Sequence, residues 1–194
     1  MSQIPALLLF LLPLAYSPGP GNMIFAANGA RFGLRATLPA SAGYHIATWV
    51  VTVLIGLGLG SALTVYPALA QALQWAGAAY VLWLALRMAR AGRPAATGQA
   101  RALGFGGGAL LLVLNPKAYV IIALMFTQFL HQGAWAEVAV IASVFTLNNL
   151  IAFTLWTVAG DRLARRFRDP AQARVLNGVL AAMLAGVAVW MALA

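Results

Sequence analysis

The segment Ser17-Pro18-Gly19-Pro20-Gly21-Asn22 interrupts an apolar run that extends from about Ile4 to Ala26. Proline removes a backbone donor and clashes with the preceding turn, and glycine adds freedom to leave the helical region. This segment therefore cannot continue a regular helix. A second apolar run, from Phe105 to Leu130, is interrupted in the same way by Asn115-Pro116-Lys117. The sequence predicts two helices that are each broken by a proline motif.

The composition places these helices in a membrane. Of the 194 residues, 63% are hydrophobic and only 8% are charged, whereas a soluble domain is about 45–50% apolar and about 25% charged. Such a chain cannot build a polar surface, so we expect an all-α integral membrane protein. A spanning helix needs about 20 apolar residues, and six such segments stand out: Ile4–Ala26, Leu38–Leu59, Pro67–Leu86, Phe105–Leu130, Trp135–Ala159 and Val175–Leu193.

Basic residues cluster in alternate connections between these segments. The first, third and fifth connections hold eleven of the twelve Lys and Arg residues, and the second and fourth hold none. Because basic loops stay in the cytoplasm, we expect these loops to be cytoplasmic and, with six spans, both termini to be periplasmic. If the first segment enters the membrane and returns, the N-terminus would lie inside. Met1–Ser17 carries no Lys or Arg ahead of its apolar run, so we do not expect a signal peptide.

Several function classes are excluded by what the sequence lacks. The net charge of +9 follows from the loop pattern, because no basic face is interleaved with stacking aromatic residues as in nucleic-acid binding. The chain has no cysteine, no phosphate-binding Walker loop and no acidic or histidine cluster with metal-ligand spacing. No nucleophile, base and orienting acid can be assembled inside the membrane. We therefore expect no enzyme activity, no metal and no cofactor.

The two breaks indicate an inverted repeat within one transmembrane domain that covers residues 1–194. Three spans in each half place the halves in opposite orientations, with a first repeat at about 1–88, a basic cytoplasmic loop at about 89–104 and a second repeat at about 105–194. Paired breaks at matching positions of inverted halves point to a transporter's binding site. We therefore expect the substrate to be bound by Pro18, Gly19, Pro20, Gly21, Asn22, Asn115, Pro116 and Lys117.

Lys117 lies about 12 residues into its span, which is about 18 Å at 1.5 Å per residue. A basic residue near mid-membrane costs about 2.5–3.5 kcal/mol on insertion scales and usually faces a cavity. Its partner is predicted to be helix carbonyls, water or a substrate carboxylate; the alternative is a lysine bonded permanently to carbonyls that Pro116 releases. A half-helix starting near Asn22 would present its positive end to a carboxylate, unless this break only shapes packing.

Polar side chains recur along one face of two other spans, and we expect them to line the cavity. They are Ser41, Tyr44, His45 and Thr48 in the second span, and Thr146, Asn148 and Asn149 in the fifth. His45 can titrate near physiological pH, so it is either a proton relay or a packing histidine. The fifth-span residues either line the cavity or bond between helices. Two small-residue pairs, Gly56 with Gly60 and Ala182 with Gly186, suit close helix contact within the chain or in a homodimer.

The first break, followed by Gly33-Leu34-Arg35 and Gly43, resembles the N-terminal signature of the LysE/RhtB amino-acid exporter family, and Asn115-Pro116-Lys117 resembles that family's second motif. The resemblance runs along nearly all of the chain. Trp75–Tyr80 and the last span are most similar to cysteine and O-acetylserine exporters. The resemblance implies a secondary, proton-linked antiporter in the bacterial inner (plasma) membrane, which exports amino acids or close metabolites from the cytoplasm.

Some members of that family carry an acid at the position of Gly21 or near Thr48, where this chain is uncharged. This difference argues against lysine as the substrate and favours a small neutral zwitterion. Because those acids are missing, His45 and Lys117 become the candidate residues for the proton route. Alternatives are a passive channel or facilitator of the same fold and a non-transporting membrane assembly subunit. A metal-ion exporter is disfavoured because the spans hold no buried Asp, Glu or Cys.

Overall fold

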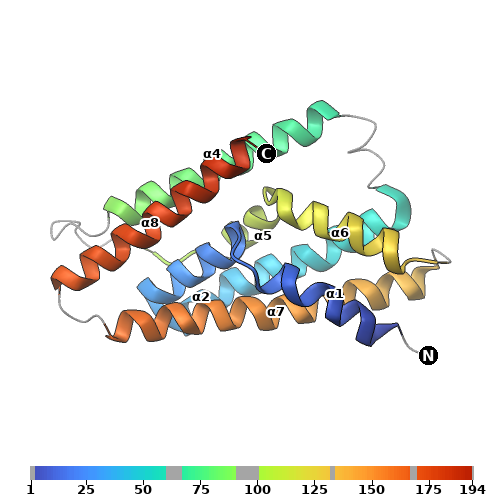
Figure 1. Cartoon of the computed structure of the whole chain (residues 1–194), viewed down its shortest axis with the longest axis horizontal. Helices are drawn as coiled ribbons and strands as arrows, with labels where there is room; N and C mark the ends of the chain where they lie inside the picture. The colour runs from blue at the N-terminus through green and yellow to red at the C-terminus, as the bar shows by residue number, and fades with distance from the viewer. Residues whose placement is uncertain (1–2, 60–66, 91–100, 132–133, 167–169, 194) are drawn as a thin grey trace.

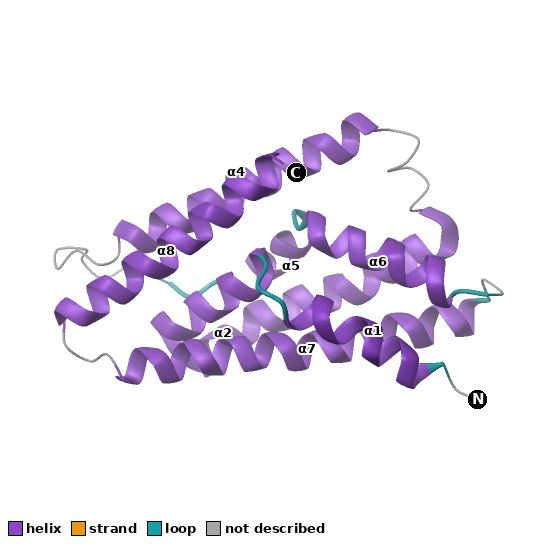
Figure 2. Ribbon diagram, in the orientation of Figure 1, coloured by secondary structure: helices purple, strands orange, loops and turns teal. Residues whose placement is uncertain are grey.

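The computed structural model describes residues 3–59, 67–90, 101–131, 134–166 and 170–193, and all regular structure in these ranges is helical (Figure 2). The elements are α1 (Ile4–Tyr16), α2 (Pro20–Leu54), a short π-helix η1 (Ile55–Leu59), α4 (Pro67–Arg90), α5 (Phe105–Val113), α6 (Pro116–Phe129), α7 (Trp135–Arg166) and α8 (Pro170–Leu193). Gly60, Arg93, Arg168 and residues 91–100 of the predicted basic loop lie outside the described residues.

Both proline motifs break their helices, as predicted. The first helix ends at Tyr16, and α2 begins at Pro20, with Gly19 in an extended conformation between them (φ −164°, ψ 175°). In the second motif, α5 and α6 are bent by 62° across Leu114 and Asn115. In each motif a proline occupies the first position of the new helix, where its missing N–H removes no helical hydrogen bond.

The turn between the first two predicted spans is shorter than the sequence suggested. Helical structure continues on both sides of Gly33, the one residue within α2 with non-helical dihedrals (φ 81°, ψ 170°). Asn28 Nδ2 donates to Thr37 Oγ1 at 3.0 Å, although residues nine positions apart in a straight helix would be about 13 Å apart. The chain therefore reverses at Gly33, and the predicted connection from Ala26 to Leu38 is too long. A positive φ at this position requires glycine.

Two described helices are long and apolar enough to span a membrane, residues 20–58 and α7, and a third is added if α5 and α6 count as one bent span. The Gly33 turn divides residues 20–58, and the part from Leu34 to Leu54 is about 31 Å long, close to the hydrocarbon thickness of a bilayer. Shorter apolar helices cover Ile4–Tyr16, Gln74–Leu86 and Gly178–Leu193. The predicted all-helical membrane protein is thus confirmed, while six spans in two inverted repeats stay a prediction.

The helices form two groups (Figure 1). Helices α4 and α8 pack mainly against each other, and α2 packs mainly against α7 and α5. The C-terminal ends of α4 and α7 and the N-terminal end of α8 lie at the left of Figure 1, whereas the chain's N-terminus and the C-terminal end of α6 lie at the right. The basic loops that the sequence assigns to the cytoplasm therefore begin or end at one end of the molecule.

Glycines allow the backbone of α2 to approach two helices closely. A Cβ atom added to Gly43 would overlap the carbonyl of Phe105 in α5, and one added to Gly108 would overlap the carbonyl of Ala40 in return. Gly29 and Gly160 make the same reciprocal contacts between α2 and α7, with the carbonyls of Thr157 and Ala26. Such small-residue crossings allow the van der Waals packing that holds helices together in a membrane.

We expect Gly108→Ala to destabilise the protein and Gly106→Ala, two residues earlier in α5, to leave it unchanged or slightly more stable. Overpacking a close contact costs about 1–3 kcal/mol, while alanine in an unobstructed helix gains about 0.5–1 kcal/mol over glycine. A Cβ atom at Gly106 meets nothing within 4 Å. Thermal unfolding of both variants in the same detergent measures the difference; equal midpoints would contradict the close crossing.

Candidate functional site

The candidate site is centred on the C-terminal end of α1, where several backbone carbonyls need hydrogen-bond donors. The last four carbonyls of any helix have no partner in that helix, and hydrocarbon offers none. Here side chains supply the donors. Ser17 Oγ donates to the carbonyl of Leu14 at 3.2 Å, and Asn22 Nδ2 donates to the carbonyl of Ala15 at 2.8 Å. The buried amide of Asn22 thus ties the start of α2 to the end of α1.

The next two carbonyls accept hydrogen bonds from the second half of the chain. Trp156 Nε1 of α7 donates to the carbonyl of Tyr16 at 3.2 Å. Lys117 Nζ of α6 donates to the carbonyl of Ser17 at 3.1 Å and to Ser17 Oγ at 2.9 Å. Four consecutive carbonyls, from Leu14 to Ser17, are therefore satisfied, and the last two tie the end of α1 to α6 and α7 through residues at least 100 positions later.

Lys117 brings the two predicted breaks together. It lies at the second position of α6, beside the break between α5 and α6, and its side chain reaches the break between α1 and α2. A Cβ atom on Gly19 would lie 2.9 Å from Lys117 Nζ, so glycine leaves the room that the ammonium occupies. The cation also lies at the C-terminal end of α1, where the helix dipole favours positive charge.

A cleft of about 540 Å³ opens where the two breaks meet. Its polar lining comes from Ser17 and Lys117, which is half-buried. The rest of its lining is apolar or small and comes from the break, α2 and α8: Pro18, Gly19, Met23, Met183, Gly186, Val187 and Trp190. A cation in a mainly apolar cleft can hold a ligand that carries one carboxylate and a small uncharged body.

The second break makes a separate contact with the second predicted span. Asn115 Nδ2 donates to the hydroxyl of Tyr44 at 3.0 Å, and both side chains are buried. Asn115 Oδ1 has no hydrogen-bond partner. Gly21, at the start of α2, faces the same region, because a Cβ atom there would lie 2.7 Å from the ring of Phe153 and 3.3 Å from the Tyr44 hydroxyl. Pro20 and Pro116 are the first residues of α2 and α6, and neither has a backbone N–H that could donate a hydrogen bond.

Four rings fill the interior beside this contact. Tyr44 and Phe153 have ring centroids 4.6 Å apart, and Phe25 packs against Phe153 at 5.0 Å. His45 lies edge-on to Tyr44 and Phe153 at 5.3 and 5.5 Å. The predicted cavity residues in this region are therefore packed in a core, and none of them is among the residues that line the cleft at Lys117.

The other predicted cavity residues also lie inside the bundle. Ser41 contacts His45 Nδ1 through its carbonyl at 2.7 Å, and Thr48 Oγ1 donates to the carbonyl of Tyr44 at 2.8 Å. Asn148 and Asn149 on α7 are buried. Several polar atoms of this region have no hydrogen-bond partner: His45 Nε2, Thr146 Oγ1 and Asn148 Nδ2. Buried unpaired polar atoms are uncommon, so these residues remain candidates for a cavity in another conformation.

Trp156 and Phe153 are parts of the site that the sequence did not single out. A tryptophan that lies partly buried inside a span needs an acceptor for its indole N–H, and this requirement is the signal by which Trp156 could have been found. No comparable signal marks Phe153, whose role depends on packing. Of the predicted small-residue pairs, Gly56 packs against Phe126 and Val138 within the chain, whereas Ala182 and Gly186 are exposed on α8.

Comparisons with known proteins agree with the motifs. The family model described as LysE type translocator matches residues 12–194. The homoserine/homoserine lactone efflux protein of Salmonella typhimurium is 28% identical over 179 residues, 89% of this chain and 87% of that protein. The cysteine/O-acetylserine efflux protein of Escherichia coli K12 is 29% identical over 183 residues, 93% and 92% of the two chains. An uncharacterized membrane protein of Vibrio cholerae is 30% identical over 198 residues, 97% and 96%.

No solved structure gives a significant match to the chain. The family match includes both proline motifs and every helix from α2 to α8. The relatives with assigned activities are efflux proteins rather than enzymes. The resemblance drawn from the two proline motifs is thus confirmed by two amino-acid efflux proteins and one membrane protein among the relatives, and this chain belongs to the LysE family of translocators.

Proposed function

We propose that the chain is a secondary transporter that exports small neutral amino acids or related metabolites across the bacterial inner membrane, in exchange for protons. The observation that carries this proposal is the meeting of the two proline breaks at Lys117 and Ser17, beside an otherwise mainly apolar cleft. Efflux of homoserine, its lactone, cysteine and O-acetylserine by relatives supports the substrate class.

The substrate's carboxylate would bind Lys117. An ammonium has three donors, and two of its contacts are made with Ser17, so one N–H remains for a ligand in the cleft. The substrate's side chain would then lie against α8. The cleft holds no acidic residue among those that line it, which disfavours a dibasic substrate.

Alternating access would follow from the inverted halves, about 1–88 and 105–194, rocking around the two breaks. In this arrangement the basic loops are cytoplasmic and both termini periplasmic. His45 is the proposed proton carrier, because its Nε2 is buried without a hydrogen-bond partner while Nδ1 contacts Ser41. A homodimer remains compatible with the exposed face of α8 that holds Ala182 and Gly186.

Replacing Lys117 by Met should abolish export, because the cation that binds the carboxylate is lost. The measurement is release of amino acids from intact cells that overexpress the chain and are loaded with dipeptides. Arg162→Met is the matched control: it removes an exposed charge at the end of α7 and should export normally.

Lys117→Met also removes the donor to the Ser17 carbonyl, so folding must be measured alongside transport. Folding is measured by the amount of the variant that is inserted in the membrane and by the midpoint of its thermal unfolding. Ser17→Ala, which keeps the carbonyl contact and removes only the hydroxyl, should retain partial export. Full export by a well-inserted Lys117→Met variant would rule out the assigned binding role.

Gly186 should set the size limit of the substrate. It lines the cleft from α8, and a Cβ atom there meets nothing within 4 Å, so a larger side chain would enter the cleft without disturbing the helix. Gly186→Leu should favour homoserine over O-acetylserine in export by about tenfold, within the range of 1–3 kcal/mol that small steric differences produce.

Gly178→Leu is the control for this experiment. It lies on the same helix, has equally open surroundings and does not line the cleft, so its substrate preference should equal that of the parent chain. Equal preferences in the Gly186 and Gly178 variants would place the substrate elsewhere.

His45→Gln should uncouple transport from the proton gradient. Glutamine keeps a polar side chain of similar length but cannot carry a proton, so accumulation against a gradient should be lost while downhill flux persists. Inverted membrane vesicles energised with ATP measure both. Unchanged accumulation would exclude His45 from the proton route, and absence of accumulation by the parent chain would favour a passive facilitator.

A further inference from the structure

An exported amino acid carries an ammonium group as well as a carboxylate, and Lys117 accounts only for the carboxylate. The sequence predicted that polar side chains of the second and fifth spans would line the substrate cavity. None of those side chains lines the cleft at Lys117. A partner for the ammonium must therefore be sought among the residues that do line this cleft.

The indole of Trp190 is the lining side chain that is best suited to attract a cation. Ser17 Oγ already donates to a carbonyl of α1 and accepts from Lys117 Nζ. None of the lining residues is acidic, and the thioethers of Met23 and Met183 are weak acceptors. The face of an indole ring carries negative electron density, and it attracts an ammonium more strongly than the rings of phenylalanine and tyrosine do.

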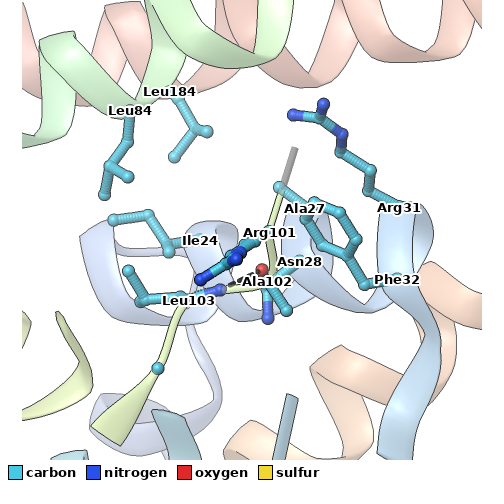
Figure 3. Close-up of a pocket in the computed structure, with 11 residues that line it drawn as sticks. Ile24, Ala27, Asn28, Arg31, Phe32, Leu84, Arg101, Ala102, Leu103 and Leu184 are labelled. Atoms are coloured by element: carbon cyan, nitrogen blue, oxygen red, sulfur yellow. Dashed lines mark hydrogen bonds between the residues drawn. The ribbon is translucent and has the colours of Figure 1, made fainter. Parts of the chain in front are cut away.

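Trp190 lies on the face of α8 that borders the cleft. The residues of α8 in the lining follow the spacing i, i+3, i+4 and i+7, which places them on one face of a helix: Met183, Gly186, Val187 and Trp190. Leu184 lies on another side of α8 and points into a separate cleft of about 350 Å³ between α2, α4 and α8 (Figure 3). Trp190 and Lys117 therefore border the same space, which has a volume of about 540 Å³.

Gly186 leaves space beside the ring of Trp190. Side chains on a helix lean toward its N-terminus and cover the preceding turn, so the indole extends over the turn that contains Gly186. A Cβ atom at Gly186 would meet nothing within 4 Å, and Trp190 is 55% exposed. Trp190 also lies in the last turn of α8, where the helix dipole favours positive charge.

We propose that Trp190 binds the ammonium group of the exported amino acid through a cation–π interaction while Lys117 binds its carboxylate. This inference rests on the proposed function and assigns a specificity-determining residue to the same cleft. A ring attracts a cation within about 6 Å of its centre, so the ammonium needs no acidic residue on this side. The headgroup of phosphatidylethanolamine also carries an ammonium beside an anionic group, so the test separates this lipid from a free amino acid.

Binding in the cleft can be measured without transport. Because the chain has no cysteine, Val187→Cys provides a single thiol in the cleft. The uncharged reagent methyl methanethiosulfonate modifies this thiol, and homoserine should slow the reaction. The concentration of homoserine that halves the rate measures its binding. The matched ligand is 2,4-dihydroxybutyrate, in which a hydroxyl replaces the ammonium.

Fluorinated tryptophans at position 190 test the ring face, because fluorine withdraws electron density from the ring and changes its shape little. The half-protecting concentration of homoserine should rise with each added fluorine, by about twofold to fivefold for a trifluorinated ring. The value for 2,4-dihydroxybutyrate should stay constant. The same replacements at Trp75, which is equally exposed and does not line the cleft, are the control.

A half-protecting concentration of homoserine that fluorination leaves unchanged would overturn the role of Trp190. That result is expected of a tryptophan that only anchors α8 at the membrane interface. Lys117→Met separates this inference from the proposed function. Protection that ignores fluorination but is lost in Lys117→Met would overturn the role of Trp190 alone. Protection that Lys117→Met leaves unchanged would count against the proposed carboxylate site, and absence of protection in the parent thiol variant would overturn both.

Vesicles of phosphatidylglycerol alone separate the two sources of ammonium, because the headgroup of this lipid has none. Protection by homoserine in these vesicles, with the same dependence on fluorination, supports binding of the free amino acid. Phosphatidylethanolamine is then added without homoserine. Slowing of the thiol reaction by this lipid, weakened by fluorination at position 190, together with no protection by homoserine, would overturn the assignment in favour of a lipid headgroup.

Discussion

Four carbonyl oxygens at the end of α1 must find donors in a region where lipid provides none, and the rest of the site follows from that requirement. The proline break creates the need. Ser17 and Asn22 meet it from nearby, whereas Trp156 and Lys117 meet it from helices far along the chain. The contacts that satisfy these carbonyls also place the half-buried ammonium of Lys117 next to a cleft.

This arrangement gives Lys117 two roles that compete. As a donor to Ser17 it stabilises the broken helix, and in the proposed function it would also bind the carboxylate of a substrate in the cleft. A ligand that drew the ammonium away would weaken its hold on the end of α1. Binding and conformation would then be linked through a single side chain, which is the kind of differential contact that a change between two states requires.

The sequence predicted what depends on local chemistry. Prolines and glycines determined where the two helices break, and the cost of burying Lys117 indicated that it would find carbonyls or a ligand; the structure gives it the carbonyl of Ser17. The sequence could not predict that Phe25, Tyr44, His45 and Phe153 fill the interior, because ring packing depends on how distant helices approach. The sequence also did not predict the reversal at Gly33. A single glycine with positive φ makes the turn there, where a connecting loop from Ala26 to Leu38 was expected.

The bonds from Trp156 and Lys117 to the end of α1 also bear on how the protein is made. Ribosomes deliver the N-terminal residues first, so the carbonyls of Tyr16 and Ser17 enter the membrane before their donors, which follow 140 and 100 residues later. Until then, those oxygens need water or the insertion machinery as a substitute. The first half is therefore an incomplete structure in lipid, and the second half acts as the element that completes its fold.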